Sequence, residues 1–182
     1  MNDYQQRQEA RFRNAPLNAP PAPWRRRWVG PVGGLLEIGF APNSELLLVV
    51  SAAGRGVFDC RTGERVARDD EASLDWADPV HLTAEGIGPL TGQTIRMAGI
   101  WGGGLPVVTE DGWHWKVIPL NWATDVGFLC PPGADIFRDL SFELCRKIHS
   151  GDRVRAGGFS ETGNSLVIAE GSGVSLMIYH RG

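Results

Sequence analysis

Short apolar runs separated by glycine, proline and asparagine limit what this chain of 182 residues can fold into. Residues 35–40, 46–51 and 56–60 are such runs, and the turn residues Pro42-Asn43 and Ala53-Gly54 lie between them. Runs of this length between turn signals are typical of antiparallel strands joined by tight turns. The sequence therefore predicts a mainly β protein, built as an antiparallel meander.

One phrase recurs along the chain. The segment 38–49, Ile-Gly-Phe-Ala-Pro-Asn-Ser-Glu-Leu-Leu-Leu-Val, is echoed by 157–168, Gly-Gly-Phe-Ser-Glu-Thr-Gly-Asn-Ser-Leu-Val-Ile. A weaker copy covers 98–108, so the units recur at a spacing of about 60 residues. Each copy reads as strand, turn and strand. This pattern predicts a repeated β-hairpin whose apolar faces share one core.

Two of these turns, 40–44 and 159–163, resemble the Phe-Ser-Pro-Asp-Gly turn of β-propeller blades, including those of the WD-repeat class. Residues 57–64, Val-Phe-Asp-Cys-Arg-Thr-Gly-Glu, resemble the end of such a blade. The resemblance implies propeller-blade-like hairpin repeats and, because propellers usually serve as interaction scaffolds, a binding role. The spacing exceeds a typical blade of about 40 residues, so the resemblance concerns the hairpin rather than a whole propeller.

Two segments differ from this β pattern. Apolar residues recur every fourth position from Ile136 to Ile148, which predicts an amphipathic helix near 134–148. Residues 1–27 hold six arginines and a stretch with four prolines, which predicts an extended Pro/Arg-rich tail that adds little stability. Within the tail, residues 2–13 have the composition of a short polar helix. We therefore expect a tail over 1–27 and a single β-rich domain over 28–182.

Charge and cysteine content narrow the class of protein. The net charge is −3, but it is unevenly distributed: residues 1–28 carry a net charge of +4 and residues 29–182 a net charge of −7. The second region contains nineteen acidic and twelve basic residues. An acidic body argues against nucleic-acid binding. The chain contains no run of 18 apolar residues, so the sequence predicts no membrane span. Three cysteines without close pairing favour a reducing, cytoplasmic location, and the preference for arginine over lysine indicates a bacterial source.

The residues of catalysis and metal binding show no convincing pattern. Cys130 and His114 are the best candidates for a nucleophile and a base, but Cys130 ends an apolar run and reads as a buried thiol. The four histidines are far apart, and no Cys-x-x-Cys occurs. The run Gly102-Gly103-Gly104 lacks the context of a phosphate-binding loop and predicts a tight turn. We expect no enzyme activity, no metal and no cofactor.

Candidate binding residues come from two stretches. Residues 69–85 hold six acids and no lysine or arginine around one tryptophan. Acids around an aromatic residue suit a basic protein partner, although a solvated loop is the alternative. Tryptophans cluster over 101–122, and they serve either core packing or a binding patch. The predicted partner-binding residues are Asp70, Glu71, Asp75, Trp76, Asp78, Trp101 and Trp113.

These features predict a non-enzymatic protein-binding module. An acidic, β-rich bacterial protein of this size suits an immunity or antitoxin-type inhibitor that neutralises a basic toxin by direct binding. The alternative is a scaffold or accessory subunit of a protein complex, and a small hydrolase-type enzyme comes third. The oligomeric state and the identity of the partner stay open.

Overall fold

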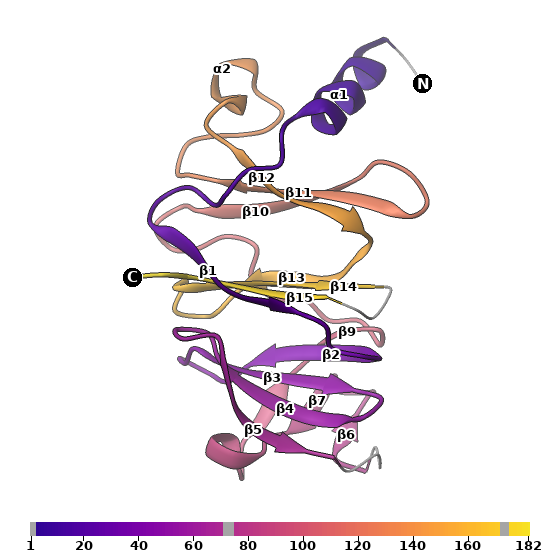
Figure 1. Ribbon diagram of the computed structural model, residues 1–182, viewed down its shortest axis with the longest axis vertical. Coiled ribbons are helices and arrows are strands. Elements are labelled where there is room, and N and C mark those ends of the chain that lie inside the picture. The colour runs from indigo at the N-terminus through magenta and orange to yellow at the C-terminus, as the bar shows by residue number, and fades with distance from the viewer. Residues whose placement is uncertain (1–2, 71–74, 172–174) are drawn as a thin grey trace.

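The computed structural model describes residues 3–70, 75–171 and 175–182 as four antiparallel sheets stacked face to face in an open row (Figure 1). Sheet A contains, in order, β10 (His114–Pro119), β11 (Thr124–Cys130) and β12 (Arg146–Asp152). Sheet B contains β1 (Trp24–Gly30), β15 (Leu176–Arg181), β14 (Ser165–Glu170) and β13 (Val154–Phe159).

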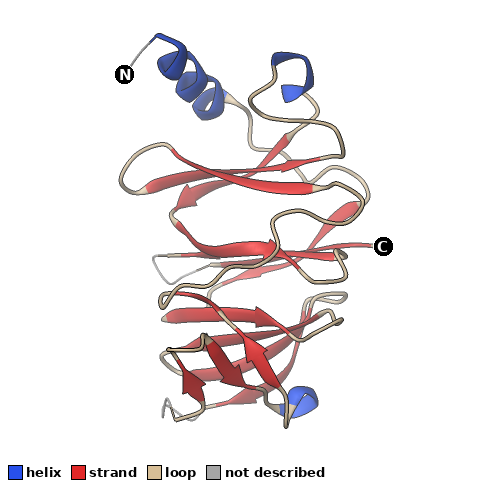
Figure 2. Ribbon diagram, turned by 180° about the vertical axis from the view of Figure 1, so that it is seen from behind, coloured by secondary structure: helices blue, strands red, loops and turns tan. Residues whose placement is uncertain are grey.

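Sheets C and D complete the row. Sheet C contains, in order, β5 (Glu64–Asp69), β4 (Gly54–Asp59), β3 (Leu46–Ser51), β2 (Leu35–Phe40) and β9 (Ala98–Gly99). Sheet D contains β6 (Ala77–Asp78), β7 (Thr83–Glu85) and β8 (Thr94–Arg96). The helical segments lie at the two ends of the row, as Figure 2 shows: α1 (Asp3–Asn14) and α2 (Asp139–Phe142) beyond sheet A, and η1 (Gly88–Leu90) beside sheet D.

Each interface between layers holds its own hydrophobic cluster. The middle strands of the inner sheets supply two clusters at once, because successive side chains of a strand point to opposite faces. Leu166 and Ile168 of β14 pack toward sheet A, whereas Val167 and Ala169 pack toward sheet C. In β3 the same alternation sends Leu47 and Val49 toward sheet B, and Leu48 and Val50 toward sheet D. Burial on both faces explains why these strands are continuous apolar runs.

The propeller resemblance is wrong for the whole protein. The sheets form a row with sheets A and D at opposite ends (Figure 1), so the described chain contains no closed ring of blades. Two of the three sequence copies do form similar hairpins, β2–β3 and β13–β14. The third copy contributes only the two-residue strand β9 before the chain becomes irregular. The mainly antiparallel β character is confirmed, but the repeated propeller blade is not.

The amphipathic helix expected near 134–148 is wrong. Only α2, four residues long, is helical there, and Leu140 is fully exposed while Ile136 is fully buried. Asp135 explains the difference, since its carboxylate accepts the Phe137 N–H and its own N–H donates to Ser141 Oγ. Such local bonds compete with a helix. From Arg146 the chain joins β12 instead, paired with β11.

The N-terminal segment is packed rather than extended over its first part. Phe12 of α1 is buried against the rings of Phe128, Phe137 and Phe142. The buried ammonium of Lys147 donates to the carbonyl oxygens of Phe12 and Arg13 at the helix end. Burial of Lys147 lowers its pKa. After the prolines, β1 begins at Trp24, so residues 24–27 belong to sheet B.

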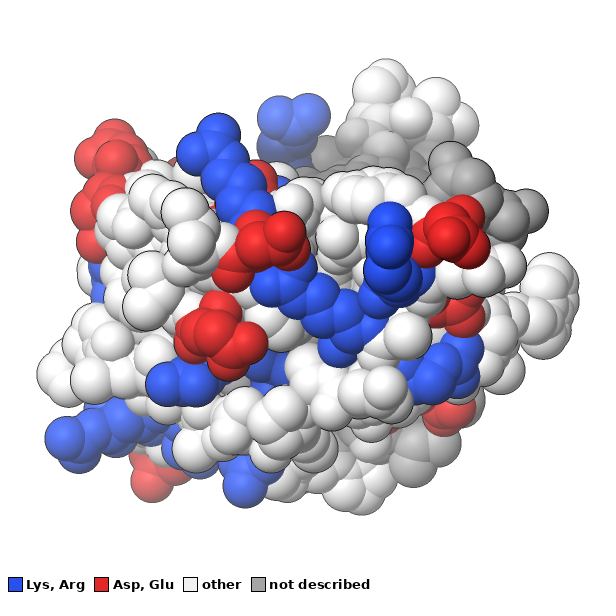
Figure 3. All heavy atoms as spheres, turned by 90° about the horizontal axis from the view of Figure 1, so that it is seen from above, with Lys and Arg blue, Asp and Glu red and all other residues white. Residues whose placement is uncertain are grey.

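The surface at the end that carries α1 and α2 mixes both signs of charge (Figure 3). Arg11 pairs with Asp139 across the two helices, and Arg13 pairs with Glu9 along α1. In the described residues, no helix is long and apolar enough to cross a lipid bilayer.

Candidate functional site

The connection between β9 and β10 exposes several apolar side chains. It runs along the side of the stack, back from sheet C to sheet A (Figure 2). Four of its large apolar residues are exposed, with exposed fractions of 55% for Ile100, 36% for Trp101, 51% for Val107 and 57% for Val108. We name residues 99–108 the side connection.

Glu37 holds the first part of the side connection in place. Its Oε1 accepts the Trp101 N–H at 2.8 Å, although the residue itself lies in the interior of β2. Burial raises the pKa of Glu37, while the hydrogen bonds from the Trp101 and Ile100 backbone and the charge of Arg155 lower it. A buried carboxyl therefore fixes the backbone of an exposed tryptophan.

Glycines allow the turn that follows. Gly103 has φ = 77°, and a Cβ there would lie 2.3 Å from the Met97 carbonyl oxygen. Only glycine meets both conditions without strain. The predicted tight turn at the glycine run agrees with this geometry.

Backbone hydrogen bonds fix the second part of the side connection. The Phe159 N–H donates to the Pro106 oxygen at 2.7 Å, and the Trp115 N–H donates to the Val107 oxygen at 2.9 Å. Gly158 permits this close approach, because a Cβ there would lie 2.6 Å from Leu105 Cβ. The backbone of the side connection is thus anchored on both β13 and β10.

A cavity of about 290 Å³ lies beside the side connection. Gly104, Leu105 and Val107 line one side, Trp115 and Val117 another, and residues 154–157 of β13 the third. The guanidinium of Arg155 is already used, since it donates to the carbonyl oxygens of Leu35 and Gly171. The cavity is mainly apolar, which suits an inserted apolar side chain.

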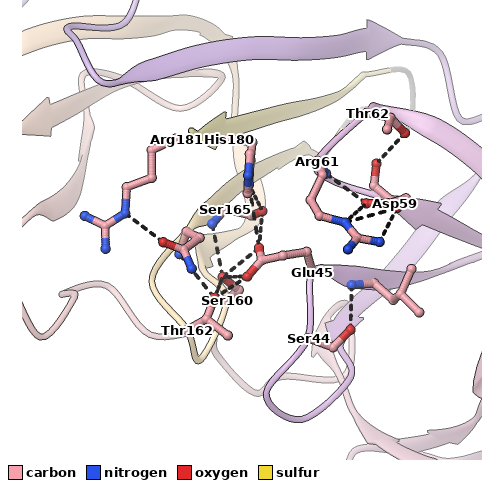
Figure 4. A network of polar contacts seen from close by, with 12 residues as sticks. Ser44, Glu45, Asp59, Arg61, Thr62, Ser160, Thr162, Ser165, His180 and Arg181 are labelled. Atoms are coloured by element: carbon pink, nitrogen blue, oxygen red, sulfur yellow. Dashed lines mark hydrogen bonds and ion pairs between the residues drawn. The ribbon is translucent and has the colours of Figure 1, made fainter.

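A separate polar network joins sheets B and C (Figure 4). The Glu45 carboxylate accepts hydrogen bonds from the hydroxyls of Ser160, Thr162 and Ser165, and the Asn43 N–H donates to Glu161 in return. The turns of the two repeated hairpins therefore lie against each other. His180 Nδ1 lies 3.0 Å from Ser165 Oγ, and burial lowers the pKa of this histidine.

This network is suited to structure rather than to catalysis. Ser165 is fully buried and Ser160 is 2% exposed, so a substrate has no access to either hydroxyl. The network satisfies one buried carboxylate and ties the two sheets together.

The proposed nucleophile and base, Cys130 and His114, are neighbours across β10 and β11. Cys130 is fully buried, and its hydrogen bond to Cys145 together with burial raises the pKa of its thiol. A raised pKa leaves the thiol protonated and unreactive. Among the described residues, no cluster of three or more histidine, cysteine or acidic side chains fits a metal ion.

Two carboxylates of the acidic stretch 69–85 form ion pairs with residues nearby in the sequence. Asp70 pairs with Arg68, and Asp78 pairs with His81, whose backbone N–H it also binds. Trp76 is 6% exposed in the cluster between sheets C and D, with the Arg55 guanidinium 4.6 Å from its ring centre. Trp76 is therefore a core residue, and its indole is not available to a partner.

The other expected binding residues lie apart from one another. Asp75 precedes Trp76 at the start of the sheet D segment, and Glu71 lies outside the described residues. Trp113 is 8% exposed and packs edge-to-face on Trp24 between sheets A and B. Of the seven expected residues, Trp101 alone combines an exposed aromatic ring with a fixed backbone in the described chain.

Comparison with known proteins gives no relative: no family model, no curated protein and no solved structure matches this chain.

Residue-based reasoning missed most of the side connection. Ile100, Val107 and Val108 resemble core residues in the sequence, because exposure depends on where the chain leaves sheet C. Glu37 was also missed, although a lone acid inside the run Leu-Leu-Glu-Ile is a signal for a buried carboxyl with a specific partner.

Proposed function

We propose that this protein is a non-enzymatic protein-binding module and that the side connection is its partner-binding surface. The observation that carries the proposal is the exposure of Trp101 on a backbone held by the buried Glu37 carboxyl. Binding costs less when the contact residues are already ordered. An aromatic anchor of this kind is typical of the residues that dominate protein interfaces.

The cavity beside the side connection supports a protein partner. Its volume of about 290 Å³ is close to the lower end of small-ligand pockets, and one or two side chains of a partner fill such a space. The exposed valines at 107 and 108 extend the apolar area at its rim. We propose that the partner inserts an apolar side chain here while its surface covers Trp101.

The finer form of the proposal is an immunity or antitoxin-type inhibitor, acting in a bacterial cytoplasm. The acidic excess of residues 29–182 supports a basic partner, because opposite net charges speed association. The three described thiols are free and buried, which is compatible with a reducing compartment. In this form the partner is a basic toxin that the module neutralises by direct binding.

A scaffold or accessory subunit is the second candidate. The specific observation that favours it is the exposed apolar face of the α2 segment, where the exposed fractions are 48% for Phe137, 101% for Leu140 and 57% for Leu144. A protein with two separate apolar surfaces is suited to holding two partners together.

The test begins with the products of adjacent genes, each purified and titrated into this protein by calorimetry. For a partner that binds, Trp101→Ala should weaken affinity about 30-fold, equivalent to about 2 kcal/mol, because it removes a central aromatic contact. Trp122→Ala is the matched control, since Trp122 is 88% exposed at the tip of the β10–β11 hairpin.

Growth assays separate the two candidates. An inhibitor should rescue cells that express the partner, and Trp101→Ala should lose the rescue. A scaffold should bind without any toxicity to rescue. Equal affinity for wild type and Trp101→Ala would show that the side connection is not the binding surface.

A further inference from the structure

A groove of about 460 Å³ opens between sheets B and C, at the edge formed by β1 and β5. It is separate from the side connection. Its wall and floor come from Trp28 and residues 31–33, from Val49 and Ser51 of β3, and from β4, and its rim carries Arg65 and Arg68. The volume lies in the range of pockets that hold small molecules.

A β-bulge in β1 places the aromatic wall of this groove. Trp24 and Trp28 are four residues apart, so regular alternation would put both on one face of the strand. The register of β1 with β15 shifts between Arg26 and Trp28, which leaves Arg27 as the extra residue. Trp24 therefore faces sheet A, while Trp28 turns to the side of Ile178 and faces sheet C.

A second bulge, in β5, places the charges. Arg65 and Arg68 are three residues apart, so regular alternation would put them on opposite faces. The register of β5 with β4 shifts so that Arg65 lies opposite Phe58, Arg68 lies opposite Gly56, and Val66 is the extra residue. Phe58 packs toward sheet B. Both guanidinium groups thus lie on the face that lines the groove.

Glycine opens the space between these walls. Gly56 is flanked by Val49 across the strand pair and has no side chain to fill the floor. The rings of Trp28 and Phe58 lie 5.1 Å apart with an interplanar angle of 52°. Gly30 also contributes, because a Cβ there would lie 2.7 Å from Cζ2 of Trp28. The groove is therefore aromatic at one wall, and the side chain of Arg65 lies over its glycine floor.

The charges at the groove have one sign. No acidic residue is among the described residues that line it. Arg68 pairs with Asp70, and Arg55 uses its guanidinium on the other face of sheet C, with Asp69 and the Glu85 oxygen. Within the described chain, Arg65 makes no hydrogen bond or ion pair. A cation without a partner remains beside an aromatic wall.

We propose that this groove binds a small anion with a flat apolar body, such as an aromatic carboxylate or an aromatic phosphate monoester. The flat body stacks on Trp28 and Phe58, and the anionic group meets Arg65, with Arg68 beside it. Guanidinium groups bind carboxylate and phosphate through paired N–H donors, and aromatic walls favour planar ligands. Two bulged edge strands at one cavity support a binding role, because bulges concentrate beside functional sites.

The test uses defined probes on the whole chain. Indole-3-acetate and adenosine 5′-monophosphate each carry an aromatic ring and an anionic group. Indole carries the ring alone, and inorganic phosphate carries the anionic group alone. Two-dimensional NMR with labelled protein should show shifts of the Gly56 amide and the Trp28 indole N–H with both ring-bearing anions. We expect the separate halves to bind at least about tenfold more weakly, because each loses one set of contacts.

Three variants locate the site. Gly56→Leu fills the floor, and its Cβ fits because the φ of Gly56 is ordinary and the nearest atom is Cδ of the flexible Arg65 side chain, at 3.4 Å. Arg65→Gln removes the free charge. Each should weaken the ring-bearing anions at least about tenfold, a change of about 1.4 kcal/mol. Arg96→Gln, at an exposed arginine of β8 in sheet D, is the matched control and should leave affinity unchanged.

The outcomes decide the proposal. Circular dichroism and melting curves confirm that each variant is folded before its affinity is used. Equal binding by wild type and Arg65→Gln, or by wild type and Gly56→Leu, would overturn the groove as the site. Absence of any shift at Gly56 or Trp28 with both ring-bearing anions at about 10 mM would overturn the ligand class. Stronger binding of the carboxylate or of the phosphate identifies the anionic group.

Discussion

The middle strands β3 and β14 differ from the edge strands β1 and β5 in how regularly their side chains alternate. In β3 and β14, each successive residue changes face and is buried against one of two neighbouring sheets. In β1 and β5, a bulge breaks the alternation once. The regular strands form the core of the stack, and the bulged strands β1 and β5 line a groove at its edge, while further bulges occur in β2, β12 and β13.

This difference assigns the core and the groove to different strands of the stack. Middle strands have hydrogen-bonding neighbours on both sides, so an extra residue would break two ladders at once. An edge strand has one neighbour, and a bulge there costs fewer hydrogen bonds. In the described chain, bulges occur in the edge strands β1, β5, β12 and β13 and in one inner strand, β2. The bulges of β1 and β5 direct Trp28 and Arg65 toward one cavity.

The largest expected effect comes from the regular part. Leu166→Ala in β14 should lower the free energy of unfolding by about 3 kcal/mol, because the fully buried side chain leaves a cavity between sheets A and B. Val66→Ala, at the extra residue of the β5 bulge, should change it by less than about 0.5 kcal/mol, since Val66 is exposed. Urea unfolding measures both. Comparable losses would remove the distinction between middle and edge strands.

A smaller effect is expected at the bulged edge. Gly30→Ala should cost about 1 kcal/mol, because the new methyl group meets the Trp28 ring, 2.7 Å away at its closest atom. Gly33→Ala is the control, since a Cβ there meets nothing within 4 Å. Denaturation curves give the two costs, and the indole signal of Trp28 reports whether the ring moves. An unchanged signal in Gly30→Ala would mean that glycine is not needed at that position.

The smallest effect concerns pH and the polar link between the sheets. Burial lowers the pKa of His180 below its ordinary value of 6.5, against the opposing charge of Glu45. Between the lowered value and 6.5 the unfolded chain binds more protons, so the free energy of unfolding should fall on acidification through that window. His180→Gln should flatten this part of the profile relative to wild type.

The regular strands could be predicted from the sequence, but the bulges in β1 and β5 and the end of the expected helix could not. The runs that became β3 and β14 carry their burial in the sequence itself, as do the two similar hairpins. The bulges depend on pairing with β15 and β4, which no local pattern records. The stripe from Ile136 to Ile148 failed because strand pairing and the Asp135 turn outweighed helical spacing.

Only Trp101 of the side connection could be predicted from the sequence as a binding residue. Trp101 was expected from the cluster of tryptophans, but Trp76 and Trp113 share the same local features and are buried. Aromatic residues serve cores and interfaces equally well, so composition does not separate the two uses. The separation depends on which residues follow β9 into solvent.

Sheet B also has a kinetic consequence. Its edge strand β1 pairs with β15 from the opposite end of the described chain, whereas sheets A and D, and β2–β5 of sheet C, form between strands close in sequence. Contacts between distant segments form late, because the entropy of closing a long loop must be overcome first. Until β1 docks, β15 has an open edge that a β1 strand from another molecule fits equally well. Concentrated refolding should therefore yield strand-exchanged dimers, whereas dilute refolding yields monomers.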